Sequence, residues 1–319
     1  MIIKDKIPDI TKEIKKEELL DILVTEYSKL GPIWVKTQLQ WMDDVYRTFK
    51  DHDKFLIIIY LIKKTLDFYS RSFVKLTYDQ FYQNDSLEIG EFNITEISKE
   101  LNIPKETARR KINELENLGT IKRIKKKIII DRSSFDQVKP EKTIKRISRF
   151  LTILAGLCLD KKILSKELTS EDLEIIIKNN FSYIWKIYYE MQIPMMTKYK
   201  SIFLDLETFH IYGICAVNQH TYIQPKNAIK KNRDDYFNLI ISQNLQGMNA
   251  MSISDISGIP RATVIRKLQA LVKRKNLTID DKKHYRLSGN FVEQLKPLQK
   301  SVLNHLANFS TKVFNSGLI

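Results

Sequence analysis

The chain has 319 residues, with 53 Lys and Arg against 38 Asp and Glu, which gives a formal net charge of +15. Apolar residues make up 43% of the chain, so length and composition indicate a globular protein of about two domains and exclude a disordered basic tail. The longest apolar runs, Phe55–Ile62 and Phe150–Leu159, are far shorter than the roughly 20 residues of a membrane span. Because the charged N-terminus has no apolar signal-peptide core, we expect a cytoplasmic protein with no membrane partner.

Sequence motifs of common enzymes and metal sites are missing. The nine glycines form no phosphate-binding loop of the types G-x-G-x-x-G or G-x-x-x-x-G-K-[ST]. The five histidines include no H-x-x-x-H pair, and the two cysteines, Cys158 and Cys215, form no C-x-x-C. We therefore expect no catalytic residue, no metal and no cofactor, and hence a protein that is not an enzyme.

Amphipathic helices are predicted on both sides of a short central unit in each half of the chain. In the first half these helices are Ile33–Lys50, Asp53–Phe73 and Glu141–Leu159. A linker near Asp160–Thr169 follows. The second half has predicted helices at Glu171–Met191 and Phe291–Phe314, a break at Pro194, and a loop over Gln219–Asn232.

The central unit of the first half has the pattern of two short helices and a β-hairpin. Ile94, Ile97 and Leu101 follow the i, i+3, i+7 spacing of one helix face. Pro104 suits the first position of a second helix, which ends at Gly119. The β-branched runs between Ile121 and Asp131 enclose a lysine cluster and predict a small hairpin.

Part of this unit recurs in the second half. Ile103–Leu115 aligns without gaps on Ile259–Leu271, at an offset of 156 residues, and six of the thirteen positions are identical. The second unit is three residues shorter before the turn, has Lys275 in place of Gly119, and has an acidic hairpin tip that begins at Asp280. The order of features predicts an internal duplication.

Helix, tight turn, helix and basic hairpin resemble the winged helix-turn-helix. The resemblance covers Ile94–Ile121, with the pattern I-x-x-I-S-x-x-L-x-I-P-x-x-T-x-x-R-x-I-x-x-L-x-x-L-G-x-I, and recurs from Ile253. It implies a mainly α fold with small β-hairpin wings. The helix order is similar, by analogy, to that of MarR-like regulators, although their wing signature is absent here. Two fused copies would form a pseudo-dimer within one chain.

The duplication implies two domains. Residues 1–160 comprise the N-terminal helices and a first winged unit at about 92–132. Residues 161–319 comprise a second helical unit, a second winged unit at about 236–288 and the C-terminal helix.

The resemblance implies double-stranded DNA as the partner, because the second helix of such a unit enters the major groove. Arg and Lys read guanine, Asn and Gln read adenine, and Thr hydroxyls contact phosphate. Candidate DNA-binding residues of the first unit are Lys105, Glu106, Thr107, Arg109, Arg110, Asn113, Lys122, Arg123, Lys125, Lys126 and Lys127. Those of the second unit are Arg261, Thr263, Arg266, Gln269, Lys282 and Lys283.

The excess positive charge lies mainly in these units. Residues 94–132 hold eleven basic and six acidic side chains, a net of +5, and residues 253–286 hold nine and three, a net of +6. The two units thus carry 11 of the 15 excess charges, which predicts salt-dependent binding to phosphates.

The sequence favours a sequence-specific DNA-binding transcription regulator that reads two half-sites with two recognition helices. A plasmid-type replication initiator with tandem winged helices fits length and charge equally well, and a winged-helix protein–protein adaptor is a further alternative. Aromatic residues gather in the flanking helices, for example Trp34, Trp41, Trp185 and Tyr188, where we expect core packing. A pocket for a small-molecule effector between these helices is the alternative role.

Overall fold

The computed structural model describes residues 13–83, 86–90, 93–125, 127–131, 139–223, 231–243 and 245–317. It is mostly helical. The elements of the first half are α1 (Lys16–Thr25), α2 (Tyr27–Phe49), α3 (His52–Arg71), α4 (Tyr78–Gln83), β1 (Ser86–Ile89), α5 (Ile94–Glu100), α6 (Lys105–Asn117), β2 (Lys122–Ile124), β3 (Lys127–Asp131) and α8 (Glu141–Asp160). Those of the second half are α9 (Ser170–Asn179), α10 (Phe181–Phe203), α11 (Leu206–Ile223), α12 (Arg233–Ser242), α13 (Ala250–Ser257), α14 (Arg261–Lys273), β4 (Leu277–Ile279), β5 (Tyr285–Leu287) and α15 (Gly289–Ser316).

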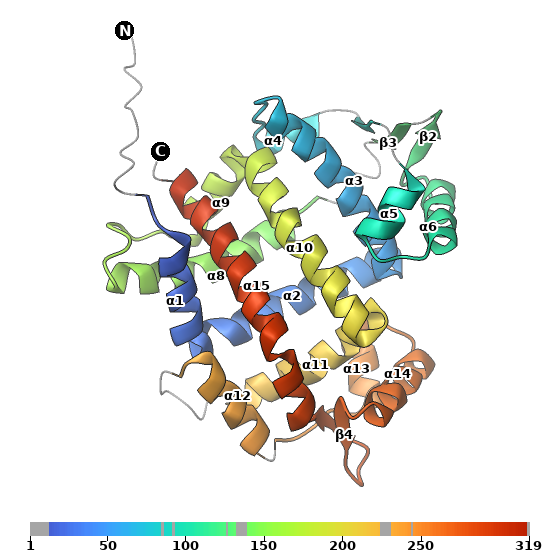
Figure 1. The fold of residues 1–319 in the computed structure, drawn as a ribbon, viewed down its shortest axis with the longest axis vertical. Helices are drawn as coiled ribbons and strands as arrows, with labels where there is room; N and C mark the ends of the chain where they lie inside the picture. The colour runs from blue at the N-terminus through green and yellow to red at the C-terminus, as the bar shows by residue number, and fades with distance from the viewer. Residues whose placement is uncertain are drawn as a thin grey trace.

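The long helices of the two halves pack against one another. α3 lies against α10, α2 lies against α11, and α1 lies against α15 (Figure 1). The buried apolar side chains of both halves form one continuous core. No helix among the described residues is long and apolar enough to span a membrane.

The first long helix of each half ends at a residue with positive φ. Lys50 and Leu204 have φ of 53° and 74°, and of these two Lys50 adopts the left-handed helical conformation. The next residue caps the following helix: the side chain of Asp51 accepts from the backbone N–H of Asp53 at 2.8 Å, and that of Asp205 accepts from Thr208 at 2.8 Å. The helices of the two halves are also equally spaced: α1, α2 and α3 begin 154 residues before α9, α10 and α11, respectively.

Gln38 and Gln192 occupy equivalent positions at this offset, and they contact each other. Nε2 of Gln192 donates to Oε1 of Gln38 at 3.0 Å in the buried core.

Three expectations about the helices are wrong in detail. Pro194 does not break a helix but lies within α10, where buried neighbours on both sides hold the helix together despite the missing N–H. The segment 171–191 is not one helix, because Asn180 separates α9 from α10. The expected loop from Gln219 begins later, because α11 continues to Ile223, and residues 224–230 lie outside the described part.

The aromatic side chains of the long helices are mostly buried. Trp34 of α2 contacts Phe150 of α8, with ring centroids 5.2 Å apart. Tyr188 of α10 contacts Phe309 of α15 at 5.6 Å. Each half thus packs its first long helix on the helix that follows its winged unit. The expectation of core packing for Trp34 and Tyr188 agrees with this burial.

Candidate nucleic-acid interface

The first helix-turn-helix is built from α5 and α6. The Asn93 side chain caps α5 by accepting from the backbone N–H of Thr95 at 2.8 Å. Asn102 makes the turn in a left-handed conformation, with φ of 49°. α6 then begins after Pro104, and its inward face is fully buried through Ala108, Ile112 and Leu115. These three residues point inward as the sequence predicts.

The outward face of α6 carries the candidate DNA-binding side chains. Thr107 is half-buried, and the others are exposed: Lys105, Glu106, Arg109, Arg110 and Asn113. Arg109 pairs with Glu106 at 2.8 Å, and the side chain of Arg110 lies 3.6 Å from Glu114. Exposed pairs of this kind contribute roughly 0–1 kcal/mol, so both arginines can exchange these partners for a nucleic acid.

Lys111 has a different role from its neighbours, and sequence reasoning missed it. It is 7% exposed and pairs with Asp51, the residue that caps α3. Lys267, its counterpart in the second unit, pairs with Asp205, which caps α11. Lys111 and Lys267 are among the six identical positions of the repeat, which is the signal that could have found them. They hold α6 and α14 on the helical core.

The first wing is a three-stranded sheet in the order β1–β3–β2, with antiparallel pairs. The sequence predicted the hairpin of β2 and β3 but not β1, although Leu87 and Ile89 alternate inward and are buried. Lys122 and Lys125 are exposed, and Lys125 makes the hairpin turn with φ of 57°. The wing therefore presents lysines at its tip.

Two other basic candidates of the first wing are paired with acids. Arg123 donates from Nε to Glu116 at 2.8 Å, which together with the backbone N–H of Arg123 holds the pKa of Glu116 below its usual value. Lys127 pairs with Glu88 of β1. The remaining candidate, Lys126, lies outside the described residues.

The second unit repeats this construction with α13, α14, β4 and β5. Gly258 makes the turn at φ of 70°, and Val264, Leu268 and Leu271 are fully buried. Lys275 takes the left-handed conformation that Gly119 has in the first unit, with φ of 59° against 71°. The lysine therefore ends the helix in the same way as the glycine.

The outward face of α14 also carries its candidates. Arg261, Arg266 and Gln269 are exposed, and Thr263 is half-buried. Arg266 makes no ion pair within the described part of the chain. The arginine at the position equivalent to Arg110 is thus open to solvent.

The tip of the second wing is organised by Asp280. Its side chain accepts from the backbone N–H of Lys282 at 3.1 Å and of His284 at 2.9 Å, and pairs with Arg286 at 3.0 Å. The backbone hydrogen bond from His284 lowers the pKa of Asp280. This acid thus closes the turn, while Lys282 and Lys283 remain exposed.

The two units lie on one side of the molecule. Figure 1 shows α5 and α6 at one corner and α13 and α14 at another corner of the same side, with the long helices beside them. The side chain of Arg47 in α2 bridges toward the second unit by donating to the backbone carbonyl of Ile256 at 2.9 Å. Both units are therefore held on the same set of long helices.

The first unit matches a known family of DNA-binding domains. Residues 87–130 match the DeoR-like helix-turn-helix domain. No curated protein and no solved structure matches the chain. The match spans β1 to β3 and supports a winged helix-turn-helix DNA-binding protein, with DNA as its partner. A domain of this type suggests a DNA-binding transcription regulator.

Metal and thiol chemistry have little support in the described residues. They contain no cluster of three or more His, Cys, Asp or Glu side chains that could hold a metal ion. Cys158 and Cys215 are free thiols in the core, and burial raises the pKa of each to about 12. Thiols with such pKa values form little of the reactive thiolate at neutral pH.

Proposed function

We propose that the chain is a sequence-specific regulator of transcription that reads two half-sites of double-stranded DNA with α6 and α14. The second helix-turn-helix supplies what a partner subunit supplies in a dimeric repressor. Dimers of this kind contact half-sites about 34–36 Å apart, or a multiple of that distance. One chain would then span a complete site without self-association.

One observation carries this proposal: α6 and α14 expose the same residue types at equivalent positions. Arg110 corresponds to Arg266 and Asn113 to Gln269, and all four side chains are exposed. Lys105 and Arg261 open the two helices and are exposed as well. Arginine and an amide one turn apart provide the donors and acceptors that guanine and adenine present in the major groove. The candidate wing lysines would contact the backbone.

The proposal includes an internal duplication, with the two domains dividing in the loop of residues 161–169. The equal spacing of the long helices and the contact between Gln38 and Gln192 support it. The equivalent pairs Asp51–Lys111 and Asp205–Lys267 support it further. A small-molecule effector that binds among the long helices is part of the same proposal.

The test begins with selection of bound fragments from a random DNA pool. A pair of related half-sites is the expected result. The variant Arg109→Ala with Arg110→Ala should bind the selected site at least about tenfold more weakly, because each base contact contributes about 1–3 kcal/mol. Its binding to unrelated DNA should change little, and its helical circular dichroism should match that of the parent protein.

A matched control replaces Lys125 and Lys127 by Ala in the first wing. This variant should bind all sequences more weakly and show a flatter dependence of affinity on salt. A loss confined to the selected site would contradict a backbone role for the wing. Clustered direct repeats among the selected fragments would favour the replication initiator instead, and absence of DNA binding would favour the adaptor.

A further inference from the structure

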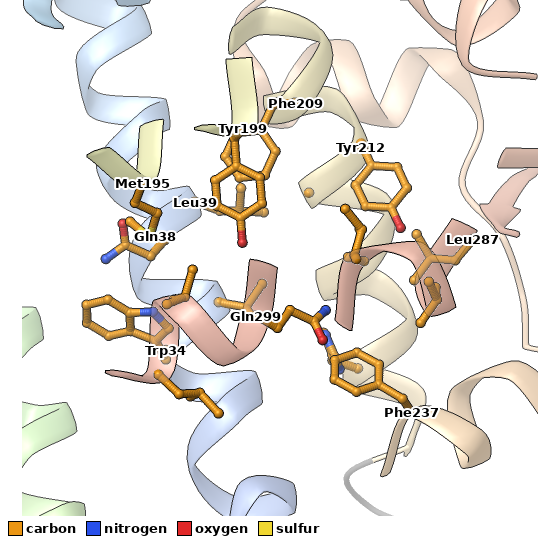
Figure 2. A pocket seen from close by; sticks show the side chains of 18 of the residues that line it. Trp34, Gln38, Leu39, Met195, Tyr199, Phe209, Tyr212, Phe237, Leu287 and Gln299 are labelled. Atoms are coloured by element: carbon orange, nitrogen blue, oxygen red, sulfur yellow. The ribbon is translucent and has the colours of Figure 1, made fainter. Parts of the chain in front are cut away.

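A cavity of about 100 Å³ lies between α2, α10, α11 and α15. Figure 2 shows side chains from both halves around it, with the hydroxyl of Tyr199 directed into the space between Leu39 and Gln299. Aromatic rings form much of the wall. Tyr199 itself stacks on Phe209, with ring centroids 3.9 Å apart. The cavity therefore has rigid, flat walls suited to a ring.

The described side chains that line the cavity carry no formal charge. His220 is neutral at physiological pH, because burial lowers its pKa to about 4. Burial also raises the pKa of Tyr27 and Tyr212 above the ordinary value, so their hydroxyls remain protonated. An anionic or cationic ligand would lose its hydration here without gaining a counter-ion. The cavity excludes charged molecules.

Two polar atoms at the cavity are buried without a hydrogen-bond partner among the described residues. One is a donor, Nε2 of Gln38, whose side chain is 7% exposed. The other is an acceptor, Oε1 of Gln299. Buried polar atoms in folded proteins are paired as a rule, and each unpaired atom costs about 1–3 kcal/mol. A ligand hydroxyl can accept from the first atom or donate to the second.

The first half has a counterpart of this cavity, and the two have diverged. Lining residues of the cavity and the counterpart correspond at the offset of 154: Trp34 and Tyr188, Val35 and Tyr189, Met195 and Trp41, Tyr199 and Val45, Phe209 and Phe55. The counterpart is an open cleft of about 520 Å³ whose lining includes charged side chains such as Arg47 and Asp44. Of the two, the smaller cavity has the lining without formal charge.

We propose that this cavity binds one neutral molecule per chain, consisting of a single ring that bears a hydroxyl group. A dry cavity of about 150 Å³ suffices for benzene in a protein core, so a somewhat smaller cavity accepts one ring after small shifts of flexible side chains. Met195 and Met196 line the wall and supply that flexibility. Gln299 recognises the hydroxyl.

The position of the cavity links it to the second winged unit. Leu287, the last residue of β5, is part of the wall, and so are Phe209 and Ala216 of α11. α11 is capped by Asp205, which holds Lys267 of the recognition helix α14. A bound ring therefore biases the placement of α14 relative to α6. This regulatory consequence rests on the proposed function, whereas binding of the ring does not.

The test uses the full chain and phenol as the probe, with benzoate as the charged analogue. Titration calorimetry without DNA should give one phenol per chain and no binding of benzoate. The variant Ala216→Ile introduces a larger side chain into the cavity wall and should abolish phenol binding. The first half has isoleucine, Ile62, at the equivalent position. The variant Gln299→Leu keeps the shape but removes the acceptor, and should weaken phenol binding about tenfold.

A matched control introduces tyrosine at Val45 in the open cleft, because the cavity has Tyr199 at the equivalent position. Val45→Tyr should leave phenol binding unchanged. If Ala216→Ile lowers the melting temperature sharply, Gln299→Leu decides the question. No binding of phenol, equal binding of benzoate, or loss of binding in Val45→Tyr would overturn the proposal.

Repeating the titration with the selected DNA should change the phenol affinity by about fivefold or more, in proportion to the coupling. An unchanged affinity would remove the regulatory part alone, and failure to bind any DNA would count against the proposed function alone.

Discussion

Two buried histidines, His52 and His220, have lowered pKa values in the folded protein. His220 lies in the core, where its Nδ1 is 2.9 Å from the hydroxyl of Tyr236. Burial lowers its pKa from an ordinary value of 6.5 to about 4. His52 is also buried, and burial together with the neighbouring His210 lowers its pKa. Both imidazoles are therefore neutral in the folded protein at physiological pH.

The free energy of unfolding should fall as the pH decreases below about 6.5, because the unfolded chain then binds protons that the folded chain cannot. Each such histidine contributes a slope of up to about 1.4 kcal/mol per pH unit, and the contribution of His220 ends near its folded pKa of about 4. Urea unfolding at several pH values between about 7 and about 5 measures the slope.

The variant His220→Gln should reduce this slope by the share of one histidine. The variant His305→Gln is the matched control, because His305 is exposed on α15, and it should leave the slope unchanged. Identical slopes in His220→Gln and the parent protein would show that His220 does not cause the acid sensitivity.

Among the helices, α6 and α14 are each attached to the core by one lysine. Lys111 and Lys267 are inward-facing cations in helices whose other inward residues are apolar. Burial alone would raise the pKa of Asp205, but the hydrogen bonds from Lys267 and Thr208 outweigh it and hold the pKa below the ordinary value. The ion pair therefore persists in its charged form and orients α14 against α11.

The substitution Lys111→Met should lower the free energy of unfolding by about 2 kcal/mol. It removes the partner of Asp51 while keeping the apolar part of the side chain. This value lies below the usual cost of breaking a fully buried pair, because the Asp51 side chain is 25% exposed. Denaturant unfolding measures the change. Lys105→Met on the exposed face of the same helix should change stability by less than about 0.5 kcal/mol. An equal effect of both substitutions would contradict the attachment role.

In the whole molecule, the two halves of the chain share one apolar core. The segment before α1 contacts α15: the backbone N–H of Ile14 donates to the side chain of Asn315 at 2.9 Å, and that side chain donates back to the Ile14 carbonyl at 3.0 Å. α3 also packs against α10. Each half therefore covers apolar surface of the other half.

Cutting the chain between α8 and α9 should not separate the halves. A protease site inserted at Lys166, an exposed residue of the connecting loop, allows the chain to be cleaved after folding. The two fragments should elute together from a size-exclusion column under native conditions and separate only in denaturant. Elution as two independent folded species would show that the halves do not share a core.

The sequence predicted local structure better than contacts between distant segments. The helix periodicity around Ile97 and Ala108 identified the first winged unit, because residues a few positions apart determine that pattern. β1 was missed because its pairing with β3 joins distant segments. The predicted helix break at Pro194 was wrong, because tertiary packing outweighs the local preference of proline.

For the candidate site too, the sequence predicted local features and missed features that depend on distant residues. Exposure of Arg109, Arg110 and Arg266 follows from helix periodicity, and the structure agrees. The inward role of Lys111 required knowledge of Asp51, which lies 60 residues away in the chain. The cavity around Gln38 depends on four helices at once, so no pattern within one helix predicts it. Contact of the named side chains with DNA stays a prediction.

The hydrogen bond between Gln38 and Gln192 has a direction, although the two residues are alike. When one amide gives its hydrogen and the other receives it, two identical side chains become unequal at the point where the halves meet. Among the described residues, Nε2 of Gln38 is then left without an acceptor and Oε1 of Gln192 without a donor. Two like residues thus have unlike hydrogen bonds at the point where α2 meets α10.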